Sequence, residues 1–210
     1  MSAIRSLLAV AACAIVPACG GGDDGGGVVV VDDPVGDTVA EGQARGEVLA
    51  DDVFGELAGD DYVTVIGKSA SILAAVNDGE INQAAFAVQV VVADDIFAFA
   101  NDLIIDHEDA NVELDAVVRT YGIGFIPSTA ESAVLGQASA GLAQLRATPP
   151  ADIDFAFTEL QVIMHAQALV VLDELYVHVG AGEMGDHILD QQFLVDFHLS
   201  EAEALLATFY

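Results

Sequence analysis

Each of four predicted helices carries one metal-binding side chain on its otherwise apolar face. These side chains are Glu80, His107, His165 and His198. Burying such a group is costly unless it meets a partner, so we expect the four to converge. Three imidazoles and one carboxylate suit a single borderline ion such as zinc, copper or iron. We therefore predict that one divalent transition-metal ion binds at a Glu/His3 site.

The spacing from the predicted turns places the four groups at similar heights. Glu80 and His107 lie thirteen residues before and fourteen residues after a turn near Ala93. His165 and His198 each lie sixteen residues from the glycine-rich turn at 180–182. At ~1.5 Å of rise per helical residue, each group is roughly 20 Å from its turn. The site is therefore predicted near the middle of a helix bundle.

The same layer has a second interpretation. A buried network of hydrogen bonds among these groups would set the register of the helices without binding an ion. The protein would then be a non-catalytic interaction or stress protein of the cell envelope. The sequence contains no glycine-rich nucleotide loop, nucleophile elbow or H-E-x-x-H motif. This favours a role other than catalysis and leaves any reaction unidentified.

Two further histidines flank the turn at 180–182. His178 precedes it, and His187 follows it close to Glu183 and Asp186. Such a group could bind an ion at the surface. Solvated histidines and acids at helix ends are the more common arrangement, and we favour that interpretation.

Apolar side chains recur at helical spacing over most of the chain. The clearest seam consists of Ile96, Ala100, Leu103, His107, Ala110, Leu114, Val117 and Tyr121. Similar seams run over about 69–90, 152–179 and 188–209, and a shorter amphipathic stretch covers 131–146. The pattern predicts an all-α four-helix bundle over residues 66–210, with an extra short helix between the second and third long helices. The connection at 122–150 fits either a local corner or a full-length crossover.

The N-terminal residues indicate export. Residues 1–18 contain one basic residue followed by a short apolar run, which is typical of a signal peptide. Val16-Pro17-Ala18-Cys19 resembles the lipobox of bacterial lipoproteins and implies lipidation at Cys19. We expect an outer-membrane lipoprotein facing the periplasm or the cell surface; the alternative is a soluble periplasmic or secreted protein. Residues 19–65 are predicted to be a Gly/Asp-rich tether and a mostly irregular linker, with short helical turns at about 48–57.

The charge limits the range of partners. The net charge is −29, with only five lysines and arginines in 210 residues. A chain this acidic repels phosphate backbones, so nucleic acid is excluded as a partner. The expected partners are a membrane, through the lipid anchor, and either a second copy of the chain or an envelope protein.

Three stretches resemble one known family. They are Asp106-His107-Glu108-Asp109-Ala110-Asn111-Val112-Glu113-Leu114, the helix from Asp154-Phe155-Ala156-Phe157 to His165-Ala166-Gln167-Ala168-Leu169, and His198 followed by Ala202. They are similar to a ferritin-like domain-of-unknown-function family of bacterial predicted outer-membrane or periplasmic proteins. The resemblance extends from about Ser69 to Tyr210. It implies a ferritin-like bundle in an exported protein and supplies no established activity.

The chain departs from the di-iron pattern of many ferritin-like bundles. Those proteins use Glu-x-x-His pairs, whereas the residues three before the histidines are here Ile104, Val162 and Val195. None of these side chains binds metal. A single ion is therefore favoured over a di-iron centre.

Overall fold

The computed structural model describes residues 33–210, which form six α helices and no strand. The helices are α1 (Pro34–Leu57), α2 (Tyr62–Ala87), α3 (Asp94–Thr120), α4 (Thr129–Ala147), α5 (Ile153–Val179) and α6 (Glu183–Leu206), followed by a short 3-10 turn at Ala207–Phe209. The all-helical prediction is confirmed for these residues. The predicted signal peptide at 1–18, the lipidation at Cys19 and the glycine tether lie outside the described residues.

The four long predicted helices correspond to α2, α3, α5 and α6, and the shorter stretch corresponds to α4. Local capping explains two of the boundaries. The side chain of Asp61 accepts hydrogen bonds from the first backbone N–H groups of α2, which therefore begins at Tyr62, earlier than predicted. Ser128 and Glu131 form a reciprocal capping box at the start of α4.

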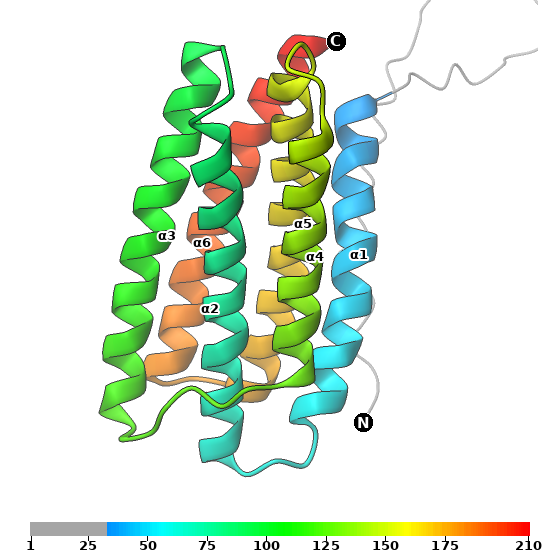
Figure 1. Ribbon diagram of the computed structural model, residues 1–210. Coiled ribbons are helices and arrows are strands. Elements are labelled where there is room, and N and C mark those ends of the chain that lie inside the picture. The colour runs from blue at the N-terminus through cyan, green and yellow to red at the C-terminus, as the bar shows by residue number, and fades with distance from the viewer. Residues whose placement is uncertain (1–32) are drawn as a thin grey trace, which may run out of the picture. The chain divides into compact units, whose positions relative to one another are not determined.

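Consecutive helices run antiparallel along the whole described chain (Figure 1). Consequently α3 and α5 run in the same direction, and α4 carries the chain back along the length of the bundle between them. Of the two connections that the sequence allowed at 122–150, the structure has the full-length crossover.

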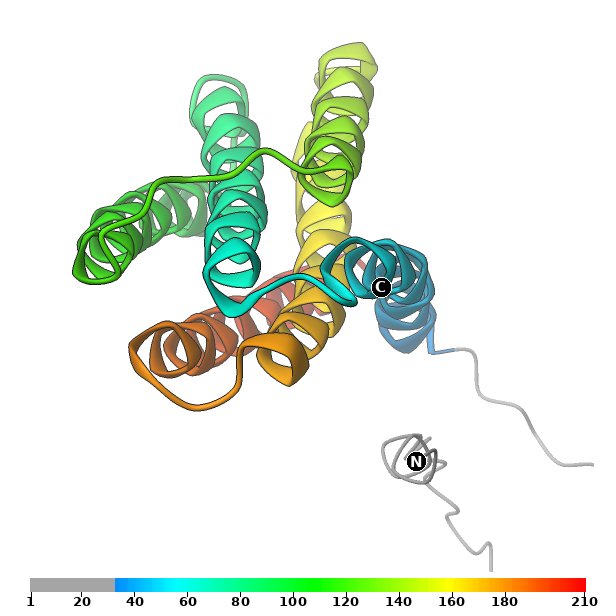
Figure 2. The same cartoon turned by 90° about the horizontal axis from the view of Figure 1, so that it is seen from below.

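Four helices enclose a common core. α2 packs against α3 and α5, and α6 packs against the same two helices, so that the four form a ring. α1 and α4 lie outside this ring: α1 packs mainly along α5, and α4 mainly along α2 (Figure 2). The apolar core is divided into two clusters, one around Leu114, Leu172 and Ile188 and the other around Leu103 and Phe157. His107 on α3 and His198 on α6 fall between the two clusters in sequence, and His165 on α5 lies at the end of the second cluster.

The prediction of a mostly irregular linker is wrong for residues 34–57, which form α1. Asp33 caps this helix and Pro34 occupies its first turn. Gly42 and Gly46, which lower intrinsic helix propensity, face α5 at very short range. A Cβ at Gly42 would lie 2.5 Å from the carbonyl oxygen of Ile163. The glycines that make this segment resemble a linker are therefore the residues that let α1 pack closely against α5.

We expect Gly42→Ala to destabilise the protein by about 1–3 kcal/mol, because the added methyl group must push α1 away from α5. Gly55 on the same helix has no atom within 4 Å of its Cβ position. Gly55→Ala should therefore stabilise the protein, by up to about 1 kcal/mol through helix propensity alone. Urea unfolding of both variants measures the difference. Equal effects at the two positions would contradict the close packing of α1.

α5 is the central helix of the described region. By length and composition it is the one helix of residues 33–210 that could cross a membrane. However, 72% of its most apolar 18-residue window is buried inside the protein. Its apolar character is thus accounted for by contacts with α1, α2 and α6.

Candidate metal centre

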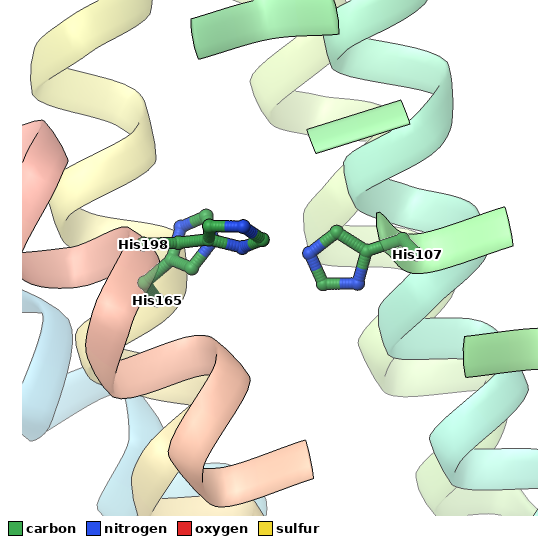
Figure 3. A group of neighbouring side chains, drawn as sticks. All are labelled: His107, His165 and His198. Carbon is green, nitrogen blue, oxygen red and sulfur yellow. The ribbon is translucent and has the colours of Figure 1, made fainter. Parts of the chain in front are cut away.

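Three of the four predicted ligands meet in the core. His107 from α3, His165 from α5 and His198 from α6 are completely buried, and their ring centroids lie 5.4–6.0 Å apart. Each ring offers one nitrogen as a ligand atom, and these three atoms lie within 4.8 Å of one another. Figure 3 shows the three rings facing one another across the space between their helices. We call this group the trihistidine centre.

The outer nitrogens of two rings are held by oxygen acceptors. His165 Nδ1 lies 2.9 Å from the carbonyl oxygen of Gln161, one turn earlier on α5. His107 Nδ1 lies 3.0 Å from Oδ1 of Asn77 on α2. Because these oxygens can only accept, each Nδ1 carries the proton and donates it. In both rings the opposite nitrogen, Nε2, is therefore unprotonated.

His198 is held in the reverse sense. Its Nε2 donates to the Oδ2 of Asp106 on α3, at 3.0 Å, and its Nδ1 is therefore the free nitrogen. A carboxylate that binds the outer N–H of a histidine fixes the ring orientation and increases the basicity of the inner nitrogen. Asp106 is 40% exposed at its side chain, so it joins the buried ring to the surface.

The inner nitrogens have no hydrogen-bond partner. His107 Nε2, His165 Nε2 and His198 Nδ1 are all buried, and none meets a donor within residues 33–210. Buried polar atoms are normally satisfied, so three unpaired nitrogens on neighbouring rings need an explanation. A cation at their common focus would satisfy all three at once. This is the arrangement by which structural and catalytic metal sites use neutral imidazole.

The protonation state suits metal binding. Burial lowers the pKa of His165 to about 3, with a further contribution from neighbouring His198. Burial also lowers the pKa of His107 well below 6.5, and the other two rings act in the same direction. These two rings are therefore neutral at pH 7, and an ion does not have to displace a proton from either of them.

A chain of amides supports His107. Asn77 Nδ2 donates to Asn111 Oδ1 at 2.9 Å, and Asn111 Nδ2 donates to Asp78 Oδ1 at 3.0 Å. The chain leads from the buried ring to the exposed carboxylate of Asp78 and fixes the amide orientation of Asn77. Sequence reasoning missed Asn77. The available signal was an asparagine in the middle of an apolar helix face.

The structure does not bring Glu80 to the histidines, which corrects the predicted fourth ligand. Among the described residues, only the three histidines form a group with metal-binding spacing. Glu80 lies three residues after Asn77 and therefore about 60° around α2. It lines a separate small cavity with residues of α1, α4 and α5, including Leu49, Val134 and Gln167. Burial raises the pKa of Glu80 to about 8, so its carboxyl group is largely protonated at pH 7.

Glu80 was predicted to face the histidines, and that prediction failed because a helix outside the four-helix ring packs against α2. α4 covers a second side of α2, so the buried surface of α2 is wider than the seam that faces the bundle centre. Gln83 shows the same effect, because its Nε2 donates to the carbonyl oxygen of Ala138 on α4 at 3.0 Å. A polar residue on this helix can therefore be buried without facing the histidines.

Comparison with known proteins adds a family assignment. Residues 67–205 match the family described as "Domain of unknown function (DUF4142)", which covers α2 to α6 almost completely. No curated protein and no solved structure matches the chain. The match confirms the resemblance at the level of a domain of unknown function, and it includes all three histidines of the centre. The chain therefore belongs to the DUF4142 family.

Proposed function

We propose that this protein binds one divalent transition-metal ion, zinc, copper or iron, at the trihistidine centre. The observation that carries the proposal is a group of three buried histidines whose ligand nitrogens lie within 4.8 Å of one another, in which each ring has one nitrogen without a hydrogen-bond partner. Imidazole nitrogen is a preferred ligand of these three metals. Contraction of each nitrogen toward a shared ion, at about 2.0–2.1 Å for zinc, needs only small side-chain shifts.

The coordination would be incomplete with protein ligands alone. Because Glu80 lies elsewhere, three histidines would leave a fourth position for water or a small ligand. The nearest carboxylate in the described network, Asp106, is engaged on the outer side of His198. An open fourth position is typical of catalytic zinc sites. Because the sequence contains no catalytic motif that names a reaction, we propose the binding function alone: a protein that stores, buffers or senses the ion.

We further propose that the fold is ferritin-like. Ferritin-like bundles consist of two antiparallel helix pairs joined by one long crossover, with metal ligands projecting inward from facing helices. The pairs α2/α3 and α5/α6, the crossover that contains α4 and the inward-facing histidines support this proposal. The absence of Glu-x-x-His pairs in the sequence favours one ion over two.

We propose that the protein acts outside the cytoplasm, anchored by a lipid on Cys19. The support is the apolar segment at 7–16 and the small residues before the cysteine. A Cys19→Ser variant should then move from the membrane fraction to the soluble fraction of the producing bacterium. Mass spectrometry of the wild-type N-terminus tests the lipid directly. An unmodified Cys19, or an intact residue 1–18 segment, would contradict the anchor.

Metal analysis of protein purified without a histidine tag tests the binding function. After incubation with each ion and removal of the excess, we expect close to one equivalent per chain for at least one of zinc, copper and iron. The structural-network interpretation gives a different result. Protein that retains no ion, and whose melting temperature is the same with ion or with chelator, would assign the buried histidines to helix register alone.

A further inference from the structure

An acidic groove runs along the surface between α3 and α6. It consists of two adjoining hollows of about 270 and 440 Å³, which share Glu113 and Asp190. Its carboxylates are Asp106, Asp109, Glu113, Glu183, Asp186 and Asp190. No lysine or arginine from residues 33–210 lines either hollow. A concave surface with one sign of charge concentrates ions of the opposite sign.

His187 is a second and independent feature of this groove. It was expected to be a solvated residue near a helix end, but it is only 3% exposed and lines the larger hollow. Its Nε2 is buried and has no hydrogen-bond partner in the described part of the chain. Burial lowers the pKa of His187, while the nearby carboxylates of Glu113 and Asp190 act in the opposite direction. The larger hollow is thus lined by a histidine that lies near two acids and whose buried Nε2 has no partner.

The groove is also connected to the trihistidine centre. Asp106 lines the smaller hollow, and its Oδ2 accepts the hydrogen bond from His198 Nε2. The partly exposed side chain of Asp106 therefore contacts both the groove and a buried ring of the centre. This hydrogen bond links a ring of the centre directly to a surface carboxylate.

We propose that the acidic groove binds a hydrated divalent transition-metal ion beside His187, Glu113 and Asp190, and that this ion supplies the trihistidine centre. The proposal rests on the function proposed above. Imidazole and carboxylate are the ligands that borderline divalent ions accept. These donors do not form a closed group at metal-binding spacing, unlike the three histidines. The ion therefore keeps most of its water and binds weakly, which suits a site that passes it on.

The volume is sufficient for such an ion. Six waters occupy about 180 Å³ at their share of liquid volume, roughly 30 Å³ each. The hollow next to His187 measures about 440 Å³. A hydrated ion can thus enter without displacement of a helix.

Stopped-flow loading of metal-free, tag-free protein with cobalt(II) tests the proposal. The visible absorption of cobalt bound to three imidazoles reports arrival at the trihistidine centre. The groove variant is Glu113→Gln with Asp190→Asn. The control is Glu47→Gln with Asp51→Asn, which makes the same change of charge at exposed positions of α1. We expect the groove variant to load about 10-fold more slowly at low salt and the control to load at the wild-type rate.

Equilibrium titration separates this inference from the function on which it rests. The groove variant should keep the cobalt affinity of the centre within about 2-fold, because its ligands are intact. His187→Gln should remove a second, weaker binding event from the titration. If wild-type protein takes up cobalt and the groove variant loads equally fast with the same number of ions, this inference alone is overturned. Wild-type protein that takes up no cobalt overturns both proposals.

Discussion

Replacement of His165 by glutamine is expected to lower the affinity of the protein for zinc by more than about 100-fold, because loss of an outer hydrogen-bond partner alone typically costs 10–100-fold and this change removes a ligand. His107→Gln and His198→Gln should have the same effect. Isothermal titration with zinc measures the change, and far-UV circular dichroism checks that each variant is folded. Glutamine is used because its side chain fills part of the space left by the ring.

The matched control is His178→Gln. His178 lies on the same helix as His165, but its Nε2 lies 3.2 Å from Glu174 Oε1, away from the centre. This variant should bind zinc with wild-type affinity. If it loses zinc to the same degree as His165→Gln, the ion binds elsewhere and the trihistidine assignment is wrong.

Zinc should also stabilise the wild-type protein. At a free zinc concentration 100 times the Kd, binding to the folded state adds about 2.7 kcal/mol. For a chain of this size the melting temperature would rise by roughly 5–10 °C. Thermal unfolding with zinc and with a chelator measures the shift. In the three glutamine variants the shift should disappear.

Replacement of Glu80 by glutamine is expected to stabilise the metal-free protein by about 3 kcal/mol at pH 7. The pKa of Glu80 rises from 4.5 to about 8 because the group is buried. Between these values the folded protein holds a proton that the unfolded chain has released, so stability falls as pH rises. At about 1.4 kcal/mol per pH unit, the interval from 4.5 to 7 costs about 3 kcal/mol. Glutamine keeps the shape of the side chain and cannot ionise.

Denaturant unfolding between pH 4.5 and pH 8 tests this expectation, with a chelator present throughout. The two proteins should differ little at pH 4.5, and the difference should grow toward pH 8. The exposed Glu108 on α3 provides the control, and Glu108→Gln should change stability by less than about 0.5 kcal/mol at every pH. A constant difference between wild type and Glu80→Gln would show that ionisation of Glu80 is not its cause.

His165 gives the stability of the protein a pH dependence of the opposite sign to that of Glu80, and it acts at acidic pH. The pKa of His165 is lowered from 6.5 to about 3, so the unfolded chain binds a proton in this window and the folded protein does not. Stability therefore falls as pH decreases from 6.5 toward 3. The wild-type protein therefore loses stability at both ends of the pH range, because of His165 at low pH and because of Glu80 at high pH. Glu80→Gln should consequently move the pH of maximum stability upward.

The heights of the histidines follow from the sequence because the rise of an α helix per residue is constant. Counting from the turns placed His107, His165 and His198 in one layer, and their rings do meet. The helical seams likewise predicted α2 to α6. Such features depend on local geometry, which a single chain segment encodes by itself.

Tertiary structure decided which buried polar groups face one another. Glu80 and Asn77 are both buried on α2, but α4 covers the side that carries Glu80, and only Asn77 reaches His107. The bond from Asp106 to His198 joins residues 92 positions apart, and its direction depends on how α3 and α6 are rotated about their axes. The glycines of α1 allow this helix to pack closely against the backbone of α5, which the sequence of α1 alone does not reveal. The periodicity of apolar residues predicts which side chains are buried. Which residues those side chains contact depends on how helices distant in sequence pack together.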